Sequence, residues 1–310
     1  MTGAGGDLIW IASSLLAALF LTWRMAVQQR IRAEMSVNAA ALSRFFFGWP
    51  IAIAILAGFM LATGRSALPE LSGAFWLFAW AAGFAQMVAT NLIIMSFGHR
   101  GLVSGTAYMK TETIIVALLG WMLLGEALPI LAWAGIVIVT AGIIILASDR
   151  GLRGVMRWFA GLGKPAAITG LSAGFLFALT AIFIKYAANS IPPDESRTFS
   201  GLTVLVAVLG FQAIMQSAYV MLREPDQFGA MLRRWRVTAQ VGLLAALASA
   251  GWFIAYAHAP VALVGILGQT QIFYSLGFGR WYLKEPVSRD ELTGLLLVGA
   301  GVILTLVSGI

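Results

Sequence analysis

Long runs without a charged residue or histidine restrict what this chain can fold into. There are nine of them, at 8–23, 45–64, 71–98, 127–148, 165–184, 198–222, 237–257, 259–279 and 292–310. Most come close to the ~20 apolar residues that a helix needs to cross a hydrocarbon core of ~30 Å. A tenth segment, 107–126, is interrupted only by Lys110 and Glu112. We therefore predict an all-α membrane protein with ten transmembrane helices.

The charged residues indicate the orientation of the chain in the bilayer. Only 11% of the residues are charged, against about 25% in a soluble domain. The net charge is +7, but the basic residues lie in short connections between the runs, so we interpret them as topology signals and not as a nucleic-acid surface. Fourteen of them fall on one side and three on the other. Because basic loops stay in the cytoplasm, both termini are predicted to lie outside it.

The sequence contains an internal repeat. Shifting it by 159 residues aligns the segment from about 95 to 148 with the C-terminal part, so that His99 falls on His258 and Glu126 on Glu285. We expect two five-helix domains, 1–148 and 165–310, joined by a basic linker at 149–164. Since five is odd, the second domain enters the membrane from the opposite side, which makes the repeats inverted.

Two pairs of motifs carry a resemblance to a known family. LLGEALP (123–129) precedes AGIVIVTAGIIIL (134–146), and YLKEPVS (282–288) precedes TGLLLVGAGVILTL (293–306). This pattern resembles the drug/metabolite transporter superfamily, EamA type, over essentially the whole chain. The resemblance implies a ten-helix carrier of small metabolites, often an exporter, with a central cavity. It further implies an integral protein of the bacterial inner membrane.

Lys110 and Glu112 are the leading site candidates. A continuous helix from 102 to 124 would place both charges near mid-depth, where facing lipid costs about 2.5–3.5 kcal/mol for each charge. Two residues apart, they project from opposite flanks and need other partners. The repeat aligns them with Gln269 and Gln271. We therefore expect these four residues to bind substrate, with Glu112 as a coupling proton site. The alternative is an ion pair or hydrogen bond that only fixes helix packing.

Other polar or aromatic residues lie deep in the predicted helices. Candidates for further substrate contacts are Tyr108, Gln86, Asn91, Trp252 and Tyr274. For Gln86 and Asn91, simple hydrogen bonds between helices are an equal alternative.

Residues near the helix ends are given structural roles. We expect His99 and His258 to stand at helix entries, and Glu126 and Glu285 to cap the helices that follow them. Gly135 and Gly142, like Gly294 and Gly301, share one helix face and predict close helix packing. Arg24 and Arg44 are expected to extend toward the membrane surface.

These features favour a secondary transporter over other membrane proteins. The sequence has no cysteine, no P-loop, no cofactor motif and no cluster of metal-ligating residues. We expect alternating-access transport of amino-acid-like, zwitterionic or organic-anion metabolites, by export or exchange, with a proton or counter-substrate as a further partner. The main alternative is a proton-coupled exporter of cationic or hydrophobic drugs. A membrane-embedded enzyme is a remote alternative, because no nucleophile stands with a positioned base.

Overall fold

The computed structural model describes residues 4–31, 34–100, 108–146, 163, 165–282 and 289–309, and this part of the chain is helical without a strand. The helices are α1 (Ala4–Ile31), α2 (Val37–Ala62), α3 (Gly73–Arg100), α5 (Glu112–Leu124), α6 (Ile130–Leu146), α8 (Pro165–Asn189), α9 (Arg197–Arg223), α10 (Pro225–Arg233), α11 (Trp235–His258), α12 (Val261–Leu267), the short 3₁₀ helix η1 (Gly268–Thr270), α13 (Gln271–Tyr282) and α14 (Arg289–Gly309).

Among the described residues, six helices are long and apolar enough to cross a membrane, namely α1, α2, α3, α8, α9 and α11. Four shorter apolar helical stretches, Glu112–Leu124, Ile130–Ile145, Val261–Gly277 and Thr293–Val307, occupy the positions of the other predicted spans. The multi-pass membrane character is confirmed. The count of ten crossings and the inversion of the repeats stay predictions.

The chain folds as two compact units, and each draws on both halves of the sequence. The first, which we call unit 1, consists of Met1–Asn91 and Thr180–Ala259. Unit 2 consists of Leu92–Leu179 and Pro260–Ile310. These spatial units are distinct from the sequence repeats, whose boundaries remain a prediction.

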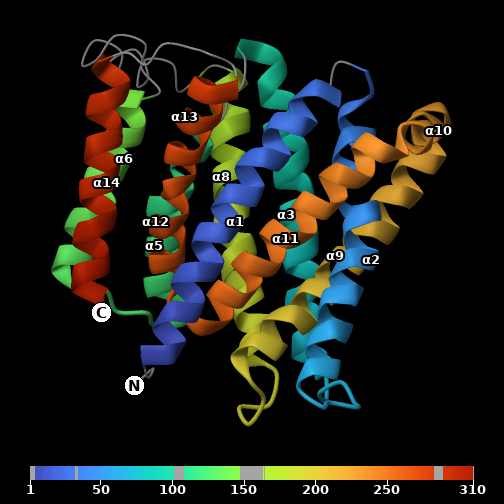
Figure 1. Cartoon of the computed structure of the whole chain (residues 1–310), viewed down its shortest axis with the longest axis horizontal. Coiled ribbons are helices and arrows are strands. Elements are labelled where there is room, and N and C mark those ends of the chain that lie inside the picture. Colours follow the sequence, from blue (N-terminus) through green and yellow to red (C-terminus); the bar gives the residue numbers. More distant parts are fainter. Residues whose placement is uncertain are drawn as a thin grey trace. The chain divides into compact units, whose positions relative to one another are not determined.

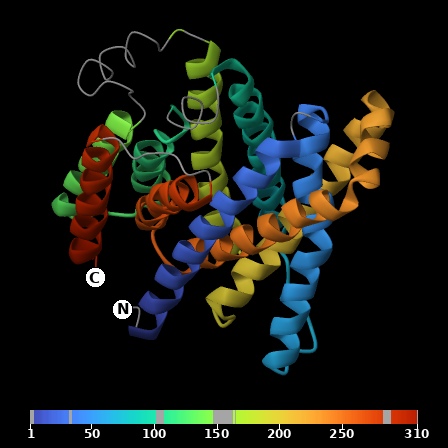
Figure 2. The same ribbon diagram turned by 45° about the horizontal axis from the view of Figure 1, so that its top comes forward.

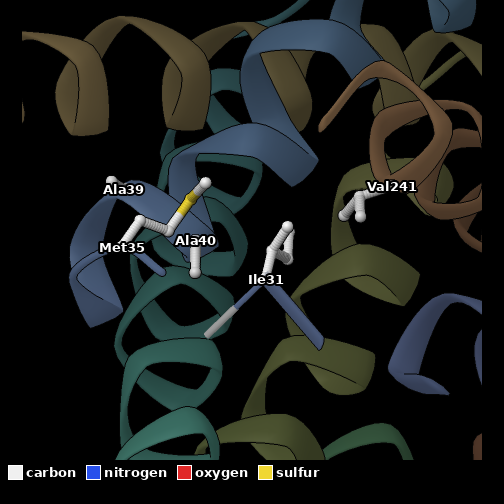
Figure 3. Close-up of a cluster of buried hydrophobic side chains, with 5 residues drawn as sticks. All are labelled: Ile31, Met35, Ala39, Ala40 and Val241. Atoms are coloured by element: carbon white, nitrogen blue, oxygen red, sulfur yellow. The ribbon is translucent and has the colours of Figure 1, made fainter. Parts of the chain in front are cut away.

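Unit 1 is built on the packing of α11 against α1 and α2, with α9 against α2 (Figure 1). Two of its helices begin at serine caps, since Ser36 and Ser196 each accept a hydrogen bond from a backbone N–H three residues later. Near the start of α2, Ile31, Met35, Ala39, Ala40 and Val241 form a buried apolar cluster (Figure 3). This cluster fixes the turn between α1 and α2 against α11.

Unit 2 contains the helix pair α6 and α14, which run side by side in both views (Figures 1 and 2). A Cβ placed on Gly135 would lie 2.7 Å from the carbonyl oxygen of Gly301, and the same holds for Gly301 against Gly135. A Cβ on Gly142 would lie 2.8 Å from the carbonyl oxygen of Gly294. Backbone therefore packs on backbone, and the predicted role of these glycines is confirmed.

Candidate functional site

The helix that carries Lys110 is interrupted at this residue. Lys110 and Thr111 form a turn, and α5 begins only at Glu112. The turn is tightened by bonds of 3₁₀ type, because the Thr111 N–H donates to the Tyr108 carbonyl at 3.3 Å and the Thr113 N–H to the Lys110 carbonyl at 3.3 Å. The Thr111 hydroxyl also donates to the Tyr108 carbonyl, at 2.8 Å. The expectation of a continuous helix from 102 to 124 is therefore wrong.

A second interruption stands 159 residues further along the chain. There η1 (Gly268–Thr270) separates α12 from α13. The Thr270 hydroxyl donates to the Leu267 carbonyl at 2.7 Å, the same bond to the third residue before it that Thr111 makes. Thr270 is the residue that the repeat aligns with Thr111. Both halves of the chain thus break an apolar helix at the same repeat position, with the same threonine bond.

The two interruptions meet within unit 2 through side-chain hydrogen bonds. The Lys110 ammonium donates to Gln271 Oε1 at 2.7 Å, and Gln269 Nε2 donates to Thr113 Oγ1 at 2.7 Å. Gln269 is 4% exposed and Gln271 6% exposed. Close packing of α12 against α5 supports these bonds, since a Cβ on Gly265 would lie 3.0 Å from a methyl group of Val116. The structure thus bonds Lys110 to Gln271 and Gln269 to Thr113, which joins three of the four polar residues that the repeat alignment paired to the contact between the two interruptions.

Glu112 differs from Lys110, Gln269 and Gln271 in its hydrogen bonding. It is half-buried in the first turn of α5, where the helix dipole favours a negative charge. Within the described residues it makes no hydrogen bond and no ion pair, although its charge interacts with that of Lys110. An ammonium and a carboxylate therefore stand two residues apart, the first hydrogen-bonded to a neutral amide and the second open to another partner.

The remaining candidates divide between the two units. Tyr108 and Tyr274 are half-buried in unit 2, with the Lys110 group. Gln86, Asn91 and Trp252 belong to unit 1. There Gln86 Oε1 accepts a hydrogen bond from Gln212 Nε2 at 3.0 Å, and Trp252 stacks on Tyr256. The Asn91 side-chain oxygen is buried without a hydrogen-bond partner in the described chain.

The structural candidates do not stand where the sequence placed them. His99 and His258 lie in the last turns of α3 and α11 and do not begin the next helices. His258 Nε2 and Thr198 Oγ1 are 3.0 Å apart in a hydrogen bond, which ties α11 to α9. The His99 side chain lies outside the described residues.

Glu126 acts as a cap, but on a different helix from the one expected. Its carboxylate accepts from the Val261 N–H at 2.8 Å, so it caps α12 from the other half of the chain instead of the adjacent α6. Glu285 lies outside the described residues.

Two arginines contradict the expectation that their side chains reach the membrane surface. Arg24 is 5% and Arg44 6% exposed. Arg24 Nη1 donates to Gln28 Oε1 at 2.9 Å, and Gln28 Nε2 donates to the Ala40 carbonyl at 2.9 Å. Arg44 Nη1 donates to Thr90 Oγ1 at 2.9 Å. The four-residue spacing of Arg24 and Gln28 places both on one helix face and accounts for their hydrogen bond, but it does not by itself indicate that Arg24 is buried.

No group of three or more histidine, cysteine, aspartate or glutamate residues in the described chain could hold a metal ion. The polar chemistry of the interrupted helices is therefore that of an ammonium, a carboxylate, two carboxamides and hydroxyl groups. Such groups bind a small polar molecule by hydrogen bonds and charge.

Comparisons with known proteins agree with this architecture. Residues 164–307 match the model of the EamA-like transporter family. A curated relative from a Sinorhizobium species, described as "Uncharacterized transporter in cobO 3'region", is 28% identical over 144 residues, which cover 44% of this chain and 96% of the relative. A crystal structure described only as that of a protein is 16% identical, with a TM-score of 0.68 over 96% of this chain and 97% of that chain. At this identity the last match shows the fold alone.

Proposed function

We propose that this chain is a membrane transporter of the drug/metabolite type, as its EamA-like match over 164–307 and its transporter-named relative support, and that it carries small zwitterionic or anionic metabolites by alternating access. The substrate contacts are Lys110, Glu112, Gln269 and Gln271. The proposal rests on the meeting of two interrupted helices, one from each half of the chain, through the bonds from Lys110 to Gln271 and from Gln269 to Thr113.

Interrupted helices suit a transport site because they free backbone groups where a ligand can use them. In a continuous apolar helix every N–H and C=O is bonded within the helix, whereas a break leaves some available to a substrate or coupling ion. Here each break also carries polar side chains that are buried or half-buried. Buried polar groups inside membrane segments are costly, and they are characteristic of substrate pathways.

The charges at the site favour a substrate that carries a carboxylate. Lys110 offers an ammonium whose described partner is a neutral amide, so a substrate carboxylate can replace or join Gln271 as its acceptor. Glu112 offers a negative charge to a substrate ammonium group. An amino-acid-like molecule has both groups, and the two glutamines supply neutral hydrogen bonds.

The repeat gives this site a mechanism. If the two halves are inverted copies, exchanging their local conformations at the two breaks opens the site first to one side of the membrane and then to the other. Equivalent threonine bonds at the two breaks support this exchange, because they give both halves the same local geometry.

A second candidate function rests on Glu112. Because it has no hydrogen bond or ion pair in the described structure, this carboxylate could take up a proton and release it when a cationic or hydrophobic compound binds. Proton-coupled export of such compounds needs a carboxylate in this position but makes no use of the Lys110 ammonium.

Transport by purified protein in liposomes tests both functions. Radiolabelled amino acids and organic anions form one panel, and quaternary amines the other. We expect uptake of the first panel and its loss, by tenfold or more (about 1.4 kcal/mol), in Lys110→Ala and Glu112→Gln. Wild-type rates in both variants would remove these residues from the site.

Two variants serve as matched controls. Lys185→Ala removes the other described lysine, whose ammonium donates to the Ala259 carbonyl in unit 1. Glu70→Gln removes an exposed carboxylate outside the helices. Both should keep transport within about twofold. Transport of quaternary amines alone, dependent on Glu112 and not on Lys110, would favour the second function.

A further inference from the structure

We propose that Arg24 and Arg44 form a binding site in unit 1 for a small oxyanion, a carboxylate or a phosphate group. This site is separate from the Lys110 group and does not depend on the function proposed for it. Three observations carry the inference: the placement of the two arginines, their unused hydrogen-bond donors, and the absence of a described acidic partner.

The two arginines are brought together by the turn between α1 and α2. The helices touch where Gln28 donates to the Ala40 carbonyl. Arg24 lies one helical turn from Gln28, and Arg44 one turn from Ala40, both on the side away from the connecting loop. Arg24 contacts Gln28 directly, and the charges of the two guanidinium groups interact. The guanidinium groups of Arg24 and Arg44 are thus close to each other, between α1 and α2.

Most of their donors are unused. A guanidinium carries several N–H groups in a planar fork, all of them donors. Arg24 spends one bond on Gln28 and Arg44 one on Thr90, and both acceptors are neutral. Arg44 Nε is fully buried with no acceptor among the described residues. The guanidinium of Arg44 also lies over the ring of Phe45, 5.2 Å from the ring centre. An aromatic ring is only a weak hydrogen-bond acceptor, so this contact does not satisfy the remaining donors.

No carboxylate in the described chain forms an ion pair with either arginine. The ion pairs found in unit 1 are Arg65 with Glu195 and Arg234 with Glu34, and they involve other residues. Two adjacent buried cations without an anion are unfavourable, because burial removes the water that would otherwise stabilise each charge. A bound oxyanion would balance the charge and occupy the free donors.

Guanidinium geometry indicates the chemical class of this anion. The planar fork matches the two oxygens of a carboxylate or phosphate, so two such groups hold an oxyanion better than they hold a spherical ion such as chloride. The group has to be small, since only 5% and 6% of the two side chains remain accessible. Arg24 lies about 6 Å along α1 from Gln28, where the candidate membrane span ends, a depth near which both soluble anions and lipid phosphates occur.

Thermal unfolding of the purified full-length protein in neutral detergent tests the site. Acetate, inorganic phosphate and sodium chloride are added at equal ionic strength, and phosphatidylglycerol is compared with phosphatidylcholine in separate samples. We expect acetate or phosphate to raise Tm saturably and chloride to have no such effect. A rise with phosphatidylglycerol alone would identify the oxyanion as a lipid headgroup. If none of the oxyanions raises Tm above chloride, the proposal is wrong.

Substitutions assign the effect to the two arginines. Arg24→Gln and Arg44→Gln should each weaken binding of the stabilising oxyanion by about thirtyfold or more, because each removes one charged partner of a buried pair. The matched control is Arg65→Gln, which removes an arginine of the same unit and should leave the affinity within about twofold. Equal affinities in all three variants would overturn the assignment.

A measurement on the unmodified chain covers the case in which these variants fail to fold. Phenylglyoxal reacts with arginine side chains, and the modified positions are identified by mass spectrometry of peptides. Saturating oxyanion should slow the modification of Arg24 and Arg44 and leave that of Arg65 unchanged. Unchanged rates at all three positions would contradict the proposal.

Discussion

Each unit holds cations inside its fold, half-buried in unit 2 (Lys110) and buried in unit 1 (Arg24 and Arg44), but their surroundings differ. In unit 2 the Lys110 ammonium has an amide acceptor in Gln271, and its charge interacts with that of Glu112 two residues away. In unit 1 the Arg24 and Arg44 guanidinium groups have neutral acceptors and no described carboxylate. The first arrangement is balanced by the chain itself. The second needs a negative charge that the described chain does not provide.

The difference teaches that burial alone does not reveal what a charged residue does. A balanced cation is stabilising in the folded protein, and removing it leaves its half-buried carboxylate neighbour without the opposite charge that stabilises it. An unbalanced pair destabilises the empty protein and stabilises it only when a ligand is bound. The sign of a mutation's effect on stability should therefore separate the two regions.

Lys110→Met should have the largest effect. It removes the cation beside Glu112 and the donor to Gln271, so we expect the free energy of unfolding to fall by about 3 kcal/mol. Denaturant unfolding in detergent measures this change. The double variant Lys110→Met/Glu112→Gln should recover most of the loss, and an additive loss in the double variant would contradict the coupling between the two charges.

Gln271→Leu and Gln269→Leu compare a charged with a neutral hydrogen bond in the same unit. Removing Gln271 leaves the ammonium without its described acceptor and should cost about 2 kcal/mol, whereas removing Gln269 breaks a neutral bond to Thr113 and should cost about 1 kcal/mol. The same unfolding assay ranks them. The reverse order would mean that Lys110 finds another acceptor without cost.

Arg44→Met should act in the opposite direction. In oxyanion-free detergent we expect the free energy of unfolding to rise by about 1 kcal/mol, because the substitution relieves repulsion from Arg24 and removes a buried N–H without an acceptor. Arg65→Met, which breaks a partly exposed ion pair, is the control and should lower it by at most about 1 kcal/mol. A clear loss of stability in Arg44→Met would show that the arginine is balanced within the chain.

Thr111→Val and Thr270→Val should have the smallest effects. Each removes one hydroxyl bond to a backbone carbonyl, and we expect a loss of about 0.5 kcal/mol for each. The measurement sharpens the comparison of the two halves, because equivalent breaks should respond equally. A large loss at one position and none at the other would indicate that the two breaks have different structural roles.

The apolar helices and the pairing of 110–112 with 269–271 could be predicted from the sequence. Charge-free runs locate helices through the cost of burying charge, and the repeat aligned the polar residues that the structure brings together. The charge-free runs are a local signal and the repeat is a periodic one. Neither requires knowing which helices are neighbours in the fold.

The breaks and the buried arginines could not be predicted in the same way. No glycine or proline stands at Lys110–Glu112, so the usual sequence signs of an interrupted helix are absent there. The burial of Arg24 depends on Gln28 meeting a carbonyl of α2, a contact between helices that spacing alone does not reveal. Glu126 caps α12 for a similar reason, since its partner is distant in the sequence.

The glycine contacts between α6 and α14 limit how unit 2 can change shape. Because backbone rests on backbone at the two glycine contacts, we expect α6 and α14 to move together as one rigid pair. We expect bending to fall on the short connection from α5, residues 125–129, where the chain leaves the helix at Gly125 with a φ of 67°. In the transport cycle proposed above, a cross-link between α6 and α14 should therefore leave transport unchanged, whereas a substitution that stiffens position 125 should slow it.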